Sequence, residues 1–358
     1  MLRRPKKLKP IKQKESGFNY KRFSEIIKIL HSVAEHTIKN VAQIFFSDQN
    51  LLVARSGSMQ LEVKFNHGLS NISVSIDKMK DLFSFINKDT SLAIEENNLV
   101  IRSGKFISRL PAISEDSEEE KISLQERAVY WFNLPIDLLK ALNYCSISVS
   151  KTSGMAWVLN NFGFIDNDLI TTDQSRCSVY SFDNEFEDNF SLTQDTVKLI
   201  QTIKPEVYAI NESFIEFKNE TFYLKVARPT EEFPEFADEL FQAESSIQVK
   251  KDKFINAIEK VKLFSSDFKS IEGQSNPAAI RLKISENNIK IESQNHAGIG
   301  REKIPANSEG NLEILVNPFF LLDVLKLIKA ETIIFQFEED RLVFEEDKFK
   351  HVIALIKE

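Results

Sequence analysis

The residues best suited to catalysis or metal binding are five histidines and two cysteines, and their spacing supports neither chemistry. His31 and His36 are five residues apart, which places them on different faces of a helix rather than at the i, i+4 spacing of a chelating pair. Cys145 and Cys177 lack the spacing of a metal site and are too few for a disulfide framework. The sequence also contains no glycine-rich phosphate loop, Gly-x-Ser-x-Gly elbow or His-Glu-x-x-His motif. We therefore expect a non-catalytic protein without a metal site or a cofactor.

Carboxylates are numerous, with 53 Asp and Glu, but their clusters (EDSEEE, DNEFEDN and FEED) are typical of solvated loops and hairpins. A buried two-metal site stays open on sequence alone. An enzyme, for example a metal-dependent nuclease, is therefore kept as one hypothesis for the function.

One polar stretch interrupts two apolar runs in LITTDQSRCSVYSF, residues 169–182. Leu169, Ile170, Val179, Tyr180 and Phe182 are typical of strands, and residues 171–176 between them are polar. The stretch is either an ordinary hairpin tip or a rigid corner at which something binds.

Composition limits the class of protein. The chain has 358 residues, 42% of them hydrophobic and 28% charged, and no apolar run long enough to cross a membrane. No secretory signal is visible at the N-terminus, and the cysteine usage fits a reducing compartment. We therefore expect a cytoplasmic protein without a membrane partner.

Helical periodicity recurs in two sets of three segments. The first set starts at Lys21, Pro135 and Lys250, at spacings of 114 and 115 residues. The second starts at Ser75, Thr193 and Asn317, at spacings of 118 and 124. Between them the chain alternates with period two around turn residues, which predicts antiparallel hairpins. The pattern predicts an α+β fold of three repeated domains, each with two helices packed on antiparallel sheet.

Charge blocks suggest the boundaries of these domains. The first 14 residues hold seven Lys or Arg and no acid, and SEDSEEEK at 114–121 is an acidic run. We expect a basic, disordered tail over residues 1–17 and domains over 18–119, 128–243 and 244–358. The tail is expected to attract DNA weakly, although a targeting address or an inert segment are alternatives.

Basic charge is concentrated on the predicted helices. Each of the six segments is neutral or positive, whereas the whole chain carries −7. Lys21 and Lys28, and likewise Lys253 and Lys260, are seven residues apart on exposed stripes, while Phe254, Ile258 and Val261 are expected in the core. Positive helices on an acidic protein indicate a surface for a polyanion, although a merely solvated face is the simpler explanation for any one helix.

The repeat and several motifs together resemble the bacterial sliding clamp, the beta subunit of DNA polymerase III, over residues 18–358. LITTDQSRCSVYSF is similar to the strand pair around its Thr-Asp-Gly-His-Arg-Leu motif. IRSGKFISRLPAI, ARPTEEFPEF and VNPFFLLDVLKLIKAETIIFQF resemble the ends of its first two domains and its last helix with the following strand. HVIALIKE stands at the place of its C-terminal tail.

The resemblance implies a head-to-tail homodimeric ring whose helices surround duplex DNA without regard to sequence. It places Phe106 and Ile107 of one subunit against Leu263 and Phe264 of the other, and Trp157 near a loop that touches DNA. Lys198, on a helix of the second set, joins the four lysines above on the DNA-facing surface.

The resemblance also implies a pocket that takes short apolar peptides from the polymerase, the clamp loader and repair proteins. The matching positions are Leu159, Thr172, Arg176, Cys177, Pro234, Asn317, Phe320, Val352, Ile353 and Ala354. Several neighbours depart from the family pattern. Gln174 and Ser175 replace glycine and histidine, Asp238 stands where an arginine is common, and Leu355 replaces a proline before the acidic end at Glu358.

The expected function is therefore a DNA sliding clamp, a processivity factor that tethers the replicative polymerase. The alternative is a clamp-like peptide-binding module that does not encircle DNA, which the altered pocket and the modest charge of the second repeat favour.

Overall fold

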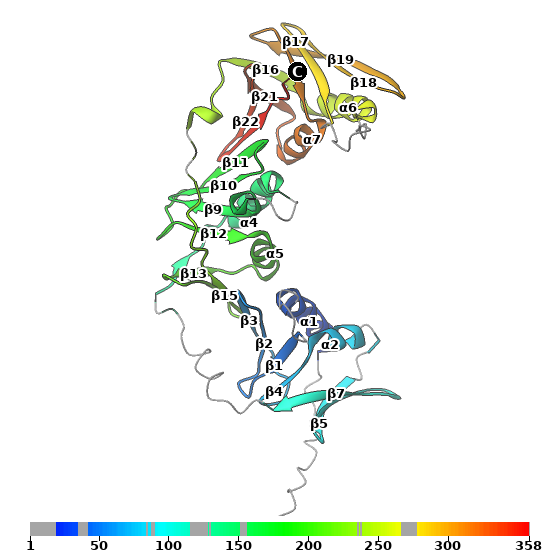
Figure 1. The fold of residues 1–358 in the computed structure, drawn as a ribbon, viewed down its shortest axis with the longest axis vertical. Helices are drawn as coiled ribbons and strands as arrows, with labels where there is room; N and C mark the ends of the chain where they lie inside the picture. The colour runs from blue at the N-terminus through cyan, green and yellow to red at the C-terminus, as the bar shows by residue number, and fades with distance from the viewer. Residues whose placement is uncertain are drawn as a thin grey trace, which may run out of the picture. The chain divides into compact units, whose positions relative to one another are not determined.

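The computed structural model describes residues 19–34, 42–83, 85–86, 90–114, 128, 130–150, 156–234, 236, 238–265 and 278–357. The chain divides into two compact units (Figure 1). The first takes the residues up to Leu134 together with Lys198–Arg228, and the second takes Pro135–Val197 and Pro229–Glu358. This division cuts the second predicted domain, so the three-domain boundaries stay a prediction. The basic tail and most of the acidic run at 114–121 lie outside the described residues.

The six segments with helical periodicity all form helices, as predicted. They are α1 (Tyr20–Ala34), α2 (Ile76–Phe83), α4 (Leu138–Cys145), α5 (Gln194–Ile203), α6 (Lys251–Val261) and α7 (Pro318–Leu327). One point at which the chain passes between the two units lies within α5. No helix among the described residues is both long and apolar enough to cross a membrane.

Within its described residues, the first unit is built on an antiparallel sheet of 11 strands, in the order β5-β6-β7-β4-β1-β2-β3-β15-β14-β13-β8. The strands are β1 (Gln43–Phe46), β2 (Leu51–Arg55), β3 (Met59–Lys64), β4 (Ile72–Ser75), β5 (Thr90–Glu95), β6 (Asn98–Ser103), β7 (Phe106–Ser114), β8 (Phe132–Asn133), β13 (Val207–Ile210), β14 (Phe214–Lys218) and β15 (Phe222–Ala227). Helices α1 and α2 pack together on this sheet (Figure 1). Phe23 of α1 is fully buried there, with its ring centroid 4.8 Å from that of Phe83.

The part of the second unit that the structure describes is built on an antiparallel sheet of 12 strands, in the order β12-β9-β10-β11-β23-β22-β21-β16-β19-β18-β17-β20. The strands are β9 (Asn161–Ile165), β10 (Asp168–Thr172), β11 (Arg176–Ser181), β12 (Phe190–Thr193), β16 (Ser245–Lys250), β17 (Ile280–Ser285), β18 (Asn288–Asn295), β19 (Gly298–Ser308), β20 (Leu312–Val316), β21 (Thr332–Phe337), β22 (Arg341–Glu346) and β23 (Phe349–Ala354). Short 3-10 turns are η1 (Ser146–Ser148), η2 (Trp157–Asn160), η3 (Asp238–Phe241) and η4 (Lys262–Phe264).

The core of the second unit lies between the sheet and its helices. Phe254 of α6 stacks on Phe335, and Tyr144 of α4 meets the edge of Phe349 with ring centroids 4.8 Å apart. Phe254, Ile258 and Val261 are all buried, as the helical periodicity predicted. Two halves of the sheet meet where β11 pairs with β23, so segments more than 170 residues apart become neighbours. The candidate site is at this junction.

Candidate functional site

The polar stretch 171–176 contains the tip of the β10–β11 hairpin, residues 173–175, and its own side chains make it rigid. The Thr172 hydroxyl donates to the carbonyl of Arg176 at 2.9 Å and accepts from the backbone N–H of Gln174 at 3.2 Å. One carboxylate oxygen of Asp173 accepts from the backbone N–H groups of Ser175 and Arg176, each at 3.1 Å. Gln174 has a φ of 75°, which is the left-handed region that glycine occupies without strain. The tip is therefore a fixed corner rather than a loose loop.

Arg176 joins this corner to helix α7. Its Nε donates to Asp173 at 2.9 Å and its Nη1 donates to Asp323 at 2.7 Å. The guanidinium also lies over the ring of Phe320, 4.1 Å from the centroid. The Arg176 side chain is 7% exposed, so its charge is almost fully balanced by partners within the protein. Asn317 begins α7 by accepting a hydrogen bond from the backbone N–H of Phe319.

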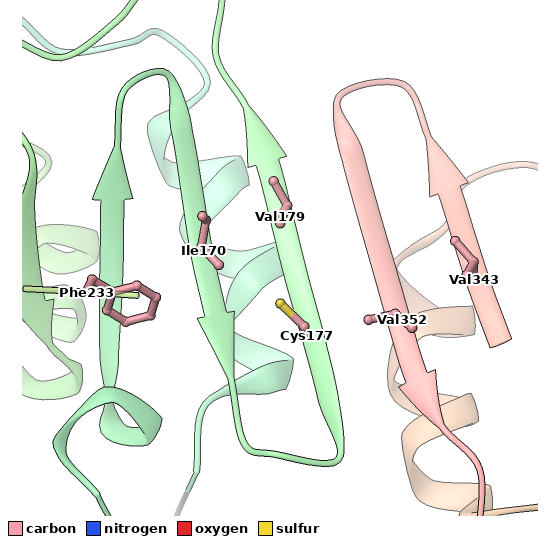
Figure 2. Packing of buried hydrophobic residues seen from close by; sticks show 6 residues of the cluster. All are labelled: Ile170, Cys177, Val179, Phe233, Val343 and Val352. Carbon is pink, nitrogen blue, oxygen red and sulfur yellow. The ribbon is translucent and has the colours of Figure 1, made fainter. Parts of the chain in front are cut away.

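The opposite face of the same strands carries an apolar cluster. It consists of Ile170, Cys177, Val179, Phe233, Val343 and Val352 (Figure 2). The register explains how they meet, because Cys177 pairs with Val352, Val352 pairs with Val343, and Ile170 pairs with Val179. We call these six residues the outer cluster.

A second apolar layer packs against the outer cluster. Its partly buried members are Trp157, Val158, Ile165, Phe236, Leu240, Phe241 and Ala243. Phe233 fixes the two layers together, since its ring lies 6.0 Å from that of Trp157 and 6.3 Å from that of Phe236. Gly163 makes room for this ring, because a Cβ there would lie 2.4 Å from Phe233. The outer cluster is therefore buried beneath the second layer, and the second layer is the apolar surface that remains partly accessible to solvent.

The structure brings together only some of the residues predicted for the peptide pocket. Cys177 and Val352 belong to the outer cluster, and Thr172 pairs directly with Cys177. Leu159 is buried in η2 beside Trp157 and Val158 of the second layer. Pro234 follows Phe233 and is exposed. Of these, Thr172, Cys177 and Val352 share the outer face of the sheet.

The remaining predicted residues lie elsewhere. Arg176 and Ile353 pair with each other and alternate with Cys177 and Val352, so they point to the helix face of the sheet. Phe320 lies beneath Arg176 on that face, and Asn317 caps α7. Ala354, exposed at the end of β23, is the exception, because it is two residues from Val352 and therefore lies on the outer face. The predicted set therefore divides into an outer apolar group and a group that fixes the hairpin to α7.

Several members of the site were not anticipated from the sequence. Asp323 and Phe233 are the most important, because one completes the ion pairs of Arg176 and the other joins the apolar layers. Ile170, Val179 and Val343 were also missed. Period-two alternation from Thr172 and Cys177 would have found Ile170 and Val179.

Burial makes the cysteine and histidine of this region chemically inert. Burial, with a smaller effect from Asp173, raises the pKa of Cys177 to about 12. Burial, with a smaller effect from Arg176, lowers the pKa of His351 to about 3. His351 Nδ1 lies 2.8 Å from the Ser178 hydroxyl, which resembles a nucleophile and its base, yet both residues are 0% exposed. No substrate can reach this pair, so its role is structural.

Trp157 packs in the second layer, and its expected contact with DNA stays a prediction. The predicted DNA-facing lysines are all exposed on helices. In the first unit these are Lys21 and Lys28 of α1 and Lys198 of α5, and in the second they are Lys253 and Lys260 of α6. Lys260 also forms an ion pair with Glu302 at 3.1 Å.

The residues predicted for subunit contact lie beside open strand edges. In β7, Phe106–Leu110 pairs with β6 while only residues 112–114 pair with β4. In β19, Gly298–Pro305 pairs with β18 while only residues 306–308 pair with β16. Ile107 is 52% exposed and Leu263 is 69% exposed. Phe264 instead packs within its own unit, since its ring lies against Gly298 and Gly300.

No group of three or more His, Cys, Asp or Glu within the described ranges is arranged to hold a metal ion.

Comparisons with known proteins place this geometry in context. Residues 241–354 match the model of the C-terminal domain of the DNA polymerase III beta subunit. No curated protein matches the chain.

Three solved structures align over nearly the whole length. The sliding clamp of Bacillus subtilis is 17% identical, with a TM-score of 0.76, and the beta subunit of Thermotoga maritima is 18% identical, with a TM-score of 0.78. A sliding clamp of Bartonella birtlesii bound to griselimycin is 16% identical, with a TM-score of 0.79. Each alignment covers 95% of this chain and 98% of the other.

The resemblance to the bacterial sliding clamp that the sequence indicated is confirmed at the level of the fold. The predicted α+β class is confirmed as well. The family with this fold is non-catalytic, as was expected of this chain. The chain is a divergent protein with the fold of the bacterial DNA polymerase III beta sliding clamp.

Proposed function

We propose that the protein is a DNA sliding clamp, which closes as a homodimer around duplex DNA and tethers a replicative polymerase to it. The observation that carries this proposal is the extent of the structural match. An alignment of 95% of this chain with 98% of the solved clamp chains means that the fold of the clamp subunit is matched over nearly its whole length. We infer a cytoplasmic protein associated with the nucleoid.

The distribution of charge supports a sliding contact. The five exposed lysines named above lie on helices of a chain whose net charge is −7. Lysines bind phosphates without reading bases, so the contacts would be independent of sequence and sensitive to salt. A ring holds DNA by enclosure, and modest local affinity is then sufficient.

The open edges of β7 and β19 support ring closure. An unpaired strand edge flanked by exposed apolar side chains accepts another strand readily. We propose that Phe106 and Ile107 of one subunit meet Leu263 of the other, with Phe264 supporting Leu263 from within its own unit. Two such head-to-tail contacts close the dimer.

The outer cluster and its second layer supply the proposed peptide site. Apolar surface fixed by a rigid sheet is suited to a short apolar segment of a polymerase or a clamp loader. Trp157, Phe236, Leu240 and Phe241 would contact this segment, with Thr172 and Pro234 at the border of the site.

The alternative is a clamp-like module that binds peptides without encircling DNA. The altered residues at the hairpin tip, Gln174 and Ser175, favour it. Light scattering at micromolar concentration distinguishes the two functions. A ring gives twice the chain mass of 41.2 kDa, whereas a single chain supports the alternative.

A further inference from the structure

The surface beside the outer cluster is acidic. Five carboxylates border it in the segment that enters and follows η3, and all five are exposed: Glu231, Glu232, Asp238, Glu239 and Glu244. None of them forms an ion pair with another described residue, unlike Glu302 and Glu313 elsewhere in the same unit. Unpaired exposed carboxylates keep their charge and set the local potential.

Apolar and acidic groups share one turn. Leu240 and Phe241 of η3 pack on the outer cluster, and Asp238 and Glu239 of the same turn stay exposed. A peptide that docks on Leu240 and Phe241 would therefore lie beside the carboxylates of Asp238 and Glu239.

The basic groups on this face do not offset the acidic charge. Arg341 is paired with Glu338 at 2.7 Å and lies 3.6 Å from Asp340. Lys350 stands directly opposite Glu345 in the strand register. Arg176 points to the other face and is fully paired. The five exposed carboxylates outnumber the basic groups named above, so we expect a negative potential over the second layer.

We propose that the peptide site selects a partner segment whose apolar side chains are flanked by lysine or arginine. Opposite charge speeds encounter and disfavours segments with acidic flanks, because like charges would be brought together at the border of the site. The same potential repels the phosphates of DNA, so the site is reserved for protein. This inference rests on the proposed peptide-binding function and adds the chemistry of the partner.

The test uses three labelled peptides that share an apolar core of two leucines and a phenylalanine. Their flanks carry two lysines, two glutamates or two serines on each side. Binding to the full chain is measured by fluorescence anisotropy at low salt and at physiological salt. We expect affinity to fall from lysine to serine to glutamate flanks, with about tenfold between the extremes at low salt and a smaller ratio at higher salt.

Two variants assign the effect to this surface. Asp238→Lys combined with Glu239→Lys is expected to remove or reverse the preference. Glu286→Lys, a matched change at an exposed turn between β17 and β18, is expected to leave it unchanged. If the double lysine variant does not fold, Asp238→Asn with Glu239→Gln is expected to bring the lysine and glutamate peptides closer together.

The results that would contradict the preference for basic flanks differ from the result that would contradict peptide binding itself. Equal affinity for all three peptides, or a lysine preference that survives the changes at 238 and 239, overturns this inference and leaves the peptide site standing. If none of the peptides binds, the peptide-binding part of the proposed function fails as well.

Discussion

The guanidinium of Arg176 and the carboxylate of Asp323 lie 2.7 Å apart, although they are 147 positions apart in the sequence. The arginine side chain is 7% exposed and the aspartate 44% exposed, so the pair runs from the interior to the surface. It fixes the tip of the β10–β11 hairpin to helix α7 and orients the strands that carry the outer cluster. The arrangement of the proposed peptide site therefore depends on an ion pair that lies outside it.

Arg176→Ala is expected to lower the free energy of unfolding by about 2 kcal/mol, because it leaves Asp173 and Asp323 without their partner and exposes Phe320. Arg176→Lys keeps the charge but loses the forked geometry, so a loss about half as large is expected. Urea unfolding, monitored by hydrogen exchange of β11 and α7 in the second unit, measures the loss of stability in both variants. The control is Arg301→Ala, which is expected to cost less than about 0.5 kcal/mol, because the Arg301 side chain is 63% exposed and its partner Glu292 keeps Lys290 and Lys283. Equal losses at the two arginines would contradict the assignment.

The buried His351 makes the second unit sensitive to acid. Its pKa is about 3 in the folded protein and 6.5 in the unfolded chain, so below pH 6.5 only the unfolded state takes up the proton. Stability is therefore present above pH 6.5 and is lost as the pH falls towards 3. At pH 5 the expected loss is about 2 kcal/mol. His67, whose pKa is lowered to about 4 by burial, acts in the same direction in the first unit.

Melting temperatures between pH 7 and pH 5 test this account, with His351→Gln as the comparison. The variant is expected to be less stable at pH 7 but to lose less stability on acidification. A wild-type melting temperature that does not change over this range would refute the assignment.

Cys177 reports directly on whether the outer cluster is covered. Because its pKa is about 12 and its side chain is buried, its reaction with a disulfide reagent at pH 7.5 is expected to be slow until the protein unfolds. Leu240→Ala with Phe241→Ala removes part of the cover and is expected to raise the rate at least about tenfold. Phe319→Ala, an exposed position on α7, provides the control. Fast reaction of Cys177 in the native protein would mean that the outer cluster is accessible to solvent.

Sequence reasoning was most successful where one physical signal decides the structure. The period of 3.6 predicted all six helices because each buries one apolar stripe, as with Phe254, Ile258 and Val261. The alternation of apolar and polar residues around turn residues predicted the hairpins, because a strand buries one of its two faces. The fold class followed from these two periods and from the spacing of the repeats.

The site was harder to predict, because it depends on contacts between distant segments. Nothing local to Arg176 indicates that Asp323 completes its ion pairs. Nothing local to Trp157 indicates that its ring lies 6.0 Å from that of Phe233. Arg176 and Cys177 are adjacent in sequence and were both assigned to the pocket, yet strand alternation places them on opposite faces.

The exposed lysines are expected to set the salt dependence of DNA binding. Replacing Lys21, Lys28, Lys253 and Lys260 by glutamate should weaken binding and make the logarithm of affinity fall less steeply with the logarithm of salt concentration. The slope should decrease by about one for each phosphate that the protein no longer neutralises. Fluorescence anisotropy with a short duplex measures both effects. Lys64→Glu, on a strand of the first unit, is the matched control and should change neither. Identical slopes for all variants would show that DNA lies elsewhere.

The most direct test of the central claim is retention on circular DNA before and after the circle is cut. Protein is assembled on a plasmid, separated from free protein by gel filtration, and the plasmid is then opened with a restriction enzyme. We predict that the protein stays on the closed circle and is lost after cutting. Leu263→Asp should abolish retention, whereas Ile334→Asp, an exposed position on β21, should preserve it. Equal retention on circular and linear DNA would contradict a ring that holds DNA by enclosure.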